Sequence, residues 1–203
     1  MSAELPAIVQ AGHPVLRAEA LPVPAEMLGT RKLRELVAAM TEVMRKAPGV
    51  GLAAPQIGVG LQLIVLEDAG ALMSRLTPED RAARGRAPFP LTVIANPVLS
   101  SPSGTARATF FEGCLSVPGY MALVERDLEV EVTGVDERGA PVTWRVSGWP
   151  ARILQHEVDH LRGTLYVDRM QSRTFCCNDE VLERWLSHSV DEVRAALDAD
   201  RRP

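Results

Sequence analysis

Two histidines four residues apart constrain this chain more than any other feature of its sequence. His156 and His160 enclose Glu157 in the run His-Glu-Val-Asp-His, within a segment that Pro150 opens as a helix and Gly163 ends. Residues four apart lie on one face of a helix, so both imidazoles can bind one metal ion while Glu157 stands beside it. A metal lowers the pKa of its bound water, and a nearby carboxylate can accept the proton as that water attacks. The pattern therefore predicts a helix that carries a catalytic metal site.

The third metal ligand decides the class of site, because two histidines do not complete one. In the metzincin pattern a third His stands six residues after the second, but that position is Tyr166, a poor ligand. In the thermolysin-like pattern a Glu some twenty residues downstream is the ligand, and Glu180 or Glu183 could fill that role. Cys114 is an equal candidate, because the glycines around it would let the backbone pass close to a metal and a substrate. The chemistry of these residues alone does not favour Cys114 over the two glutamates as the third ligand.

Composition limits the class of protein. The 203 residues are 46% hydrophobic and 24% charged, with a net charge of −4, which is typical of one soluble domain over residues 1–203. That charge gives no general attraction to nucleic acid, and no apolar stretch approaches the ~20 residues that span a bilayer. Cys114, Cys176 and Cys177 cannot form a disulfide framework, which favours a reducing compartment.

The order of expected elements predicts an α+β domain: antiparallel sheets packed around the short central helix with the two histidines, followed by a C-terminal helix. Expected elements are a helix at 30–46, strands at 62–67, 91–99, 127–135 and 141–147, and a last helix within 179–203, which ends in a tail. The polar segment 68–90 is expected to be a surface insertion.

Three motifs resemble the signature motifs of peptide deformylases, in the family's order and separation: Gly49–Gln56, Glu112–Ser116 and Gln155–Leu161. The resemblance extends from about Ile8 to Phe175. Two further segments, Gly148–Leu154 and Asp168–Phe175, resemble the mitochondrial and plant-organelle branch of the family.

This resemblance implies a metal-dependent hydrolase that removes the N-formyl group from the initiator methionine of nascent polypeptides and releases formate. The metal ligands it implies are Cys114, His156 and His160. Glu157 would take a proton from the attacking water and return it to the leaving amine. The side-chain amide of Gln56 and the backbone N–H of Leu115 would stabilise the developing oxyanion.

The resemblance also places the substrate. The backbones of Val50, Gly51 and Gly113 would hydrogen-bond to an extended peptide. Trp149 and Ile153 would line the methionine pocket, together with Gly51 and His156. Arg152 stands nearby, at a position where other branches of the family carry an aliphatic residue.

Family membership implies one divalent metal per chain, Fe²⁺ in the cell, with Zn²⁺, Ni²⁺ or Co²⁺ able to substitute. The expected partners are nascent N-formylmethionyl peptides and, transiently, the ribosome. We expect a monomer with no direct nucleic-acid binding and no membrane association. Residues 1–10 lack the features of a signal or transit peptide, which leads us to expect a bacterial cytoplasmic location.

Overall fold

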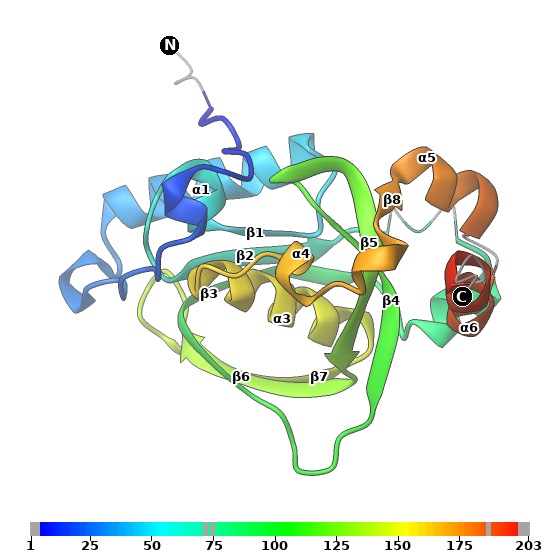
Figure 1. The fold of residues 1–203 in the computed structure, drawn as a ribbon. Coiled ribbons are helices and arrows are strands. Elements are labelled where there is room, and N and C mark those ends of the chain that lie inside the picture. The colour runs from blue at the N-terminus through cyan, green and yellow to red at the C-terminus, as the bar shows by residue number, and fades with distance from the viewer. Residues whose placement is uncertain (1–4, 71–72, 74–75, 186–187, 199–203) are drawn as a thin grey trace.

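The helix with the two histidines, α3, lies inside a curved layer of antiparallel strands in the computed structural model (Figure 1). The structure describes residues 5–70, 73, 76–185 and 188–198. Its helices are α1 (Arg31–Lys46), α2 (Pro78–Ala83), α3 (Trp149–Leu161), α4 (Tyr166–Arg169), α5 (Asn178–Glu180) and α6 (Val190–Asp198). Its strands are β1 (Gly51–Ala53), β2 (Leu63–Asp68), β3 (Phe89–Ser100), β4 (Arg107–Cys114), β5 (Val117–Asp127), β6 (Glu129–Val135), β7 (Pro141–Ser147) and β8 (Cys176–Cys177).

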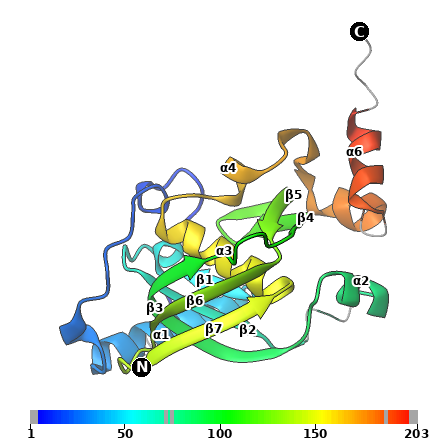
Figure 2. The same ribbon diagram turned by 90° about the horizontal axis from the view of Figure 1, so that it is seen from below.

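Two antiparallel sheets surround α3. The larger sheet has the order β1-β2-β3-β6-β7 and the smaller one has the order β4-β5-β8. In Figures 1 and 2, α3 lies against the hollow face of the larger sheet, and β4 and β5 pass its side. The predicted α+β architecture is confirmed. None of the described helices is long and apolar enough to cross a membrane.

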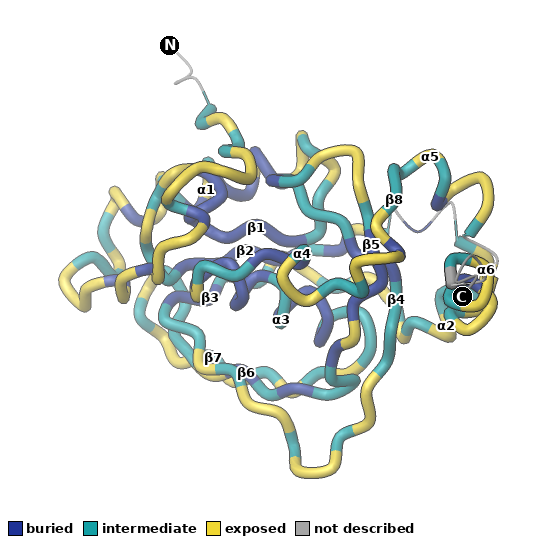
Figure 3. The backbone as a smooth tube through the Cα atoms, viewed as in Figure 1, coloured by how far each residue is buried: buried dark blue, intermediate teal, exposed yellow. Residues whose placement is uncertain are grey.

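Strand β2 contributes side chains to two hydrophobic cores, one on each face of the larger sheet. Ile64 and Leu66 face the core beneath α3, whereas Leu63 and Val65 face the core beneath α1, and all four are fully buried. Successive side chains of a strand point to opposite faces, so a continuous apolar run requires that both faces are covered. Figure 3 shows β1 and β2 in the buried interior, in contrast to the exposed connection between β3 and β4.

Local signals explain the starts of the two long helices. The Thr30 hydroxyl accepts a hydrogen bond from the backbone N–H of Leu33 at 3.3 Å, which caps α1. Gly148 precedes α3 with a φ of 69°, and Pro150 lies in its first turn. The Gly148 backbone packs so closely against that of residues 84 and 85 that a Cβ atom would lie 2.8 Å from the carbonyl oxygen of Arg84. A glycine is therefore required there on two grounds, its positive φ and this close contact.

The C-terminal region departs from the expected single helix. It consists of α5, a π-helical turn at Val181–Trp185 and α6, while residues 186 and 187 lie outside the described part of the chain. Ser189 and Glu192 explain the new start of α6: the Ser189 hydroxyl accepts from the backbone N–H of Glu192, and the Glu192 carboxylate accepts from the backbone N–H of Ser189. This reciprocal capping begins a helix in the middle of a continuous amphipathic pattern.

Candidate metal centre and cleft

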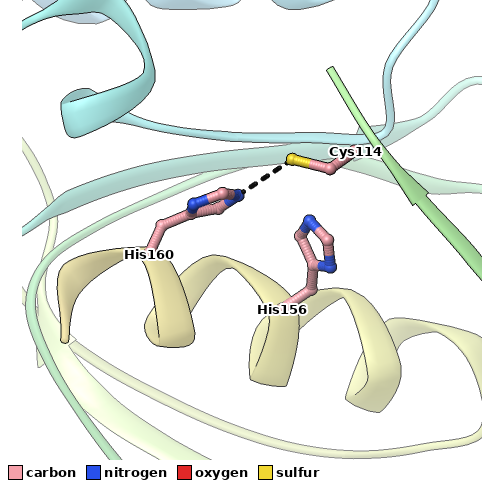
Figure 4. A group of neighbouring side chains, drawn as sticks. All are labelled: Cys114, His156 and His160. Carbon is pink, nitrogen blue, oxygen red and sulfur yellow. Dashed lines mark hydrogen bonds between the residues drawn. The ribbon is translucent and has the colours of Figure 1, made fainter. Parts of the chain in front are cut away.

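Three side chains from two elements meet above α3. Cys114 ends β4, and His156 and His160 project from successive turns of α3 towards it (Figure 4). Their candidate ligand atoms all lie within 4.8 Å of one another, and the Cys114 Sγ lies 3.3 Å from the His160 Nε2. Among the described residues this is the one group of three such side chains close enough to bind a single ion.

The chemistry of this donor set fits a catalytic transition metal. One sulfur and two imidazole nitrogens suit Zn²⁺ or Fe²⁺, and three protein ligands leave a fourth position for substrate or water. Burial lowers the pKa of His160 well below its usual value, so this imidazole is neutral, as ligation requires. Burial opposes the protonation of His156 as well, but its hydrogen bonds to Cys114 and Glu112 outweigh that effect and raise its pKa. A metal ion that binds there displaces this proton.

A buried ionic network supports the donors from behind. The Glu112 carboxylate lies 3.2 Å from the Nδ1 of His156 and accepts two hydrogen bonds of 3.0 Å from Arg126. Arg126 also pairs with Asp159, which in turn accepts hydrogen bonds of 2.6 and 2.7 Å from Arg169. Carboxylates that orient a ligating histidine through its other ring nitrogen are common behind metal sites. The network therefore sets the orientation of His156 and anchors α3 to the smaller sheet.

Glu157 lies beside the donors and is 4% exposed. Its Oε2 has no hydrogen-bond partner among the described residues, and burial raises the pKa of Glu157 to about 7. A carboxyl group with a pKa near neutrality can both accept and donate a proton at physiological pH. Gly51 faces this side chain so closely that a Cβ atom would lie 2.3 Å from the Glu157 Oε1.

The side-chain amide of Gln56 is held in one orientation. Its Oε1 accepts a hydrogen bond of 2.9 Å from the backbone N–H of Ala53. Its Nε2 therefore faces the metal centre, 3.5 Å from the Cys114 Sγ and 3.3 Å from the Ser116 Oγ. The oxygen and nitrogen of an amide differ in role, so this arrangement presents a donor to the site.

A cavity of about 470 Å³ opens over the donors. It lies between β1 and β4, each of which is the outer strand of its own sheet. The predicted residues on its wall are Val50, Gly51, Gln56, Gly113, Cys114, Leu115, Trp149, Ile153, His156 and Glu157. His160 does not line it; this side chain is 1% exposed and contacts Cys114 from below.

Arg152 lies on the same cavity wall, but both of its Nη groups form hydrogen bonds within the protein. It is 4% exposed and donates to the Glu112 carboxylate and to the carbonyl oxygens of Val124 and Ala108. Its position explains how this site accommodates an arginine: the guanidinium extends past the cavity into the ionic network.

Several wall residues were not foreseen from the sequence, including Arg86, Phe111, Tyr120 and Met121. Phe111 and Met121 belong to strands of the smaller sheet, where alternation identifies a face but not a cavity. Arg86 lies in the polar segment between β2 and β3, and nothing in its local sequence distinguishes it from a surface arginine. Neither alternative ligand belongs to the donor group found among the described residues: Glu183 is exposed, and Glu180 pairs with Arg184.

Comparisons with known proteins identify relatives of this chain. The family model described as polypeptide deformylase matches residues 5–175. A chloroplastic peptide deformylase 1A of Solanum lycopersicum is 53% identical over 84% of this chain, and a mitochondrial peptide deformylase of Homo sapiens is 46% identical over 83%. The chain spans 61% of the length of the tomato protein and 69% of the human one.

A solved structure shares the fold. The class I type b peptide deformylase of Acinetobacter baumannii with Met-Ala-Ser bound is 34% identical, with a TM-score of 0.72 over 84% of this chain and 100% of its own.

The names of these relatives contradict the expected bacterial cytoplasmic location. Chloroplastic and mitochondrial proteins stand among the relatives of highest identity, so the expected location is not upheld. That prediction was wrong because it relied on the composition of residues 1–10, and the compartment is specified by targeting sequence rather than by a catalytic fold. The matched residues include the helix with the two histidines, the cysteine that meets them and the glycine-rich strand beside them, and the chain belongs to the polypeptide deformylase family.

Proposed function

We propose that this protein is a metal-dependent hydrolase that removes the N-formyl group from the initiator methionine of nascent polypeptides and releases formate. The observation that carries the proposal is the convergence of Cys114, His156 and His160 beside the buried Glu157, in a chain of this family. The three convergent side chains would hold one divalent metal. When bound, the metal would polarise the formyl carbonyl and lower the pKa of the attacking water.

In this proposal Glu157 is the acid and base. With a pKa raised by burial to about 7, it takes the proton of the attacking water and later gives it to the leaving amine. Its unpartnered Oε2 leaves the side chain available for this transfer.

The donors for the developing oxyanion in this proposal are the Gln56 Nε2 and the backbone N–H of Leu115. The hydrogen bond from Ala53 to the Gln56 Oε1 supports this role, because it directs the amide nitrogen towards the centre before substrate arrives. Donors placed in advance stabilise the transition state without reorganisation, and removing one typically costs ~2.7–4 kcal/mol of barrier stabilisation.

We also propose that the peptide binds as an extra strand between β1 and β4. Both strands are outer strands, which supports hydrogen bonds from the backbones of Gly51 and Gly113 to an extended chain. Val50 precedes β1, and because its carbonyl oxygen already accepts a hydrogen bond from Glu67, its N–H is the group that it would offer. Recognition through the backbone does not depend on downstream side chains, which suits an enzyme that processes many different nascent chains. The methionine side chain would enter the cavity against Trp149 and Ile153.

The metal in this proposal is Fe²⁺ in the cell, with Zn²⁺, Ni²⁺ or Co²⁺ as functional substitutes. A thiolate with two imidazoles supports a transition metal of this kind over Mg²⁺ or Ca²⁺, which prefer oxygen ligands.

Formate release from formyl-Met-Ala-Ser by metal-loaded protein tests the function. We expect stoichiometric formate and free Met-Ala-Ser, with no cleavage of internal peptide bonds. Cleavage of internal bonds without formate would assign the site to a peptidase. Tight metal binding with neither product would assign it to metal sensing or storage.

A further inference from the structure

The described part of the segment between β2 and β3 packs on the beginning of α3 through residues 84–86. A Cβ atom on Gly85 would lie 3.2 Å from the Cα of Gly148, and both glycines have positive φ angles, 56° and 69°. In Figure 2 this segment, with α2, lies on the side of the molecule where β7 ends and α3 begins. The segment is therefore positioned by backbone packing next to Trp149, the first residue of α3.

Two arginines of this segment lie over the indole ring of Trp149. The guanidinium carbon of Arg86 lies 5.1 Å from the ring centroid, and that of Arg84 lies 5.7 Å from it. Arg84 also lies over the Phe110 ring at 5.0 Å. Cations at these distances are attracted to the ring, so the position of Trp149 and the positions of both arginines are coupled.

Arg86 lines the cavity and makes one hydrogen bond with its guanidinium among the described residues. Its side chain is 9% exposed, and its Nε donates to Asp68, which is 1% exposed, at 2.8 Å. Among the described residues its two Nη groups have no acceptor. Arg152, the other arginine on this wall, uses its Nη groups within the protein.

We propose that Arg86 determines which side chains the methionine pocket accepts, by adding a cationic hydrogen-bond donor to the wall that Phe111, Trp149 and Ile153 form. The pocket then takes side chains of methionine's length that end in an acceptor, including methionine sulfoxide, and rejects cationic ones. A formylated chain whose first methionine has been oxidised would remain a substrate, because the sulfoxide oxygen is a strong acceptor and the guanidinium a strong donor. This inference rests on the proposed function.

Three peptides separate the effect of a hydrogen-bond acceptor on the first side chain from the effect of that side chain's shape. They are formyl-Met-Ala-Ser, its methionine sulfoxide analogue and its norleucine analogue. Norleucine has the shape of methionine but no acceptor. In the Arg86→Met variant we expect kcat/KM for the sulfoxide peptide to fall by about tenfold more than for the norleucine peptide, as is typical for loss of a hydrogen bond to a charged group. Arg86→Lys, which keeps the cation, should restore part of this difference. Arg81→Met, a matched change in α2 of the same segment, should alter none of the three values.

Equal losses for all three peptides in Arg86→Met would overturn the proposal and leave Arg86 as a support for Trp149 alone. Because that variant could fold poorly, the unmodified protein provides a second test: it should hydrolyse the sulfoxide peptide far faster than a formyl-lysyl peptide of the same length. Similar rates for these two peptides would also overturn the proposal. Absence of formate from formyl-Met-Ala-Ser with the unmodified protein would instead count against the proposed function itself.

Discussion

Gly51 and Glu157 illustrate how closely the residues of this site depend on one another. The strand residue lies so near the carboxylate that the smallest side chain would collide with it, at 2.3 Å from the Oε1. Gly51→Ala should therefore displace Glu157 rather than unfold the protein, because β1 keeps its pairing with β2. We expect a roughly hundredfold fall in kcat, the scale of loss that a 1 Å misplacement causes. Gly60→Ala, at a glycine with open space around its Cβ position, is the control.

Glu157→Gln tests proton transfer in isolation. The amide keeps the shape of the carboxylate but neither accepts nor returns a proton, so the variant should fold and bind metal normally. We expect turnover to fall by about 10²–10⁴, the usual contribution of a general acid–base residue. Steady-state kinetics on protein with measured metal content is the appropriate assay. Near-normal turnover would remove Glu157 from the mechanism.

Substitution of Cys114 and of a downstream glutamate distinguishes the two assignments of the third metal ligand. Cys114→Ala should lose tightly bound metal, because it removes one of three convergent donors. Glu183→Ala should keep both metal and activity, because this residue is exposed and lies outside the donor group. Elemental analysis of the two purified variants distinguishes them, and full metal retention by Cys114→Ala would exclude the cysteine as a ligand.

At the scale of elements, Asp168 ties α4 to the N-terminal segment. Its carboxylate pairs with Arg17 and accepts a hydrogen bond of 2.7 Å from the backbone N–H of Leu165. Burial alone would raise the pKa of Asp168, but these two donors outweigh it, so the pKa lies below the usual value of 3.8. A carboxyl group with a lowered pKa in the folded state stabilises the fold above that usual value. It loses the contribution as the pH falls through the folded pKa.

Asp168→Asn should therefore lower the melting temperature slightly at pH 7, and this difference should shrink as the pH falls below 3.8. The effect is small because both partners are partly exposed. Melting curves of the two proteins across this pH range provide the measurement. A difference that grows as the pH falls would contradict the assigned direction of the shift.

At the scale of the whole molecule, the C-terminal elements complete a small core on the outer side of β4 and β5. Val181 and Val193 are 2% and 1% exposed and pack with Phe111 and Leu123. Truncation after Asp179 would expose this cluster, and each fully buried valine contributes about 1.5–3 kcal/mol. We expect a clear drop in the melting temperature of the truncated protein.

The same truncation tests whether the C-terminal residues contribute to ribosome binding, which we expect to be weak. Residues 179–203 carry seven acidic side chains against four arginines, a formal charge of −3, which ribosomal RNA repels. Co-sedimentation with ribosomes at low and moderate salt should therefore change little on truncation. A truncated protein that melts normally but loses strong, salt-sensitive ribosome binding would contradict this interpretation.

The sequence alone determined the parts of this protein that depend on local periodicity. The spacing of His156 and His160 predicts one helical face, and the apolar run from Leu63 to Leu66 predicts a buried strand, because both patterns arise within a few residues. The motifs were sufficient to place the chain in its family. The expected C-terminal helix is present but not continuous, because the amphipathic pattern conceals a capping pair that restarts the helix at Val190.

Only the tertiary structure decided which distant residues meet. By residue chemistry Cys114 was no better a ligand than Glu180 or Glu183, and it was the resemblance to the family that favoured the cysteine. The structure adds a physical reason, because the smaller sheet holds the end of β4 over α3. Arg86 is the clearer case, because no local pattern separates it from a surface arginine. It reaches the cavity because the backbone of its neighbour Gly85 packs against that of Gly148, which is far from it in sequence. Local patterns are set by interactions within a turn or a strand, whereas a site is set by packing between elements, and that packing is decided by the molecule as a whole.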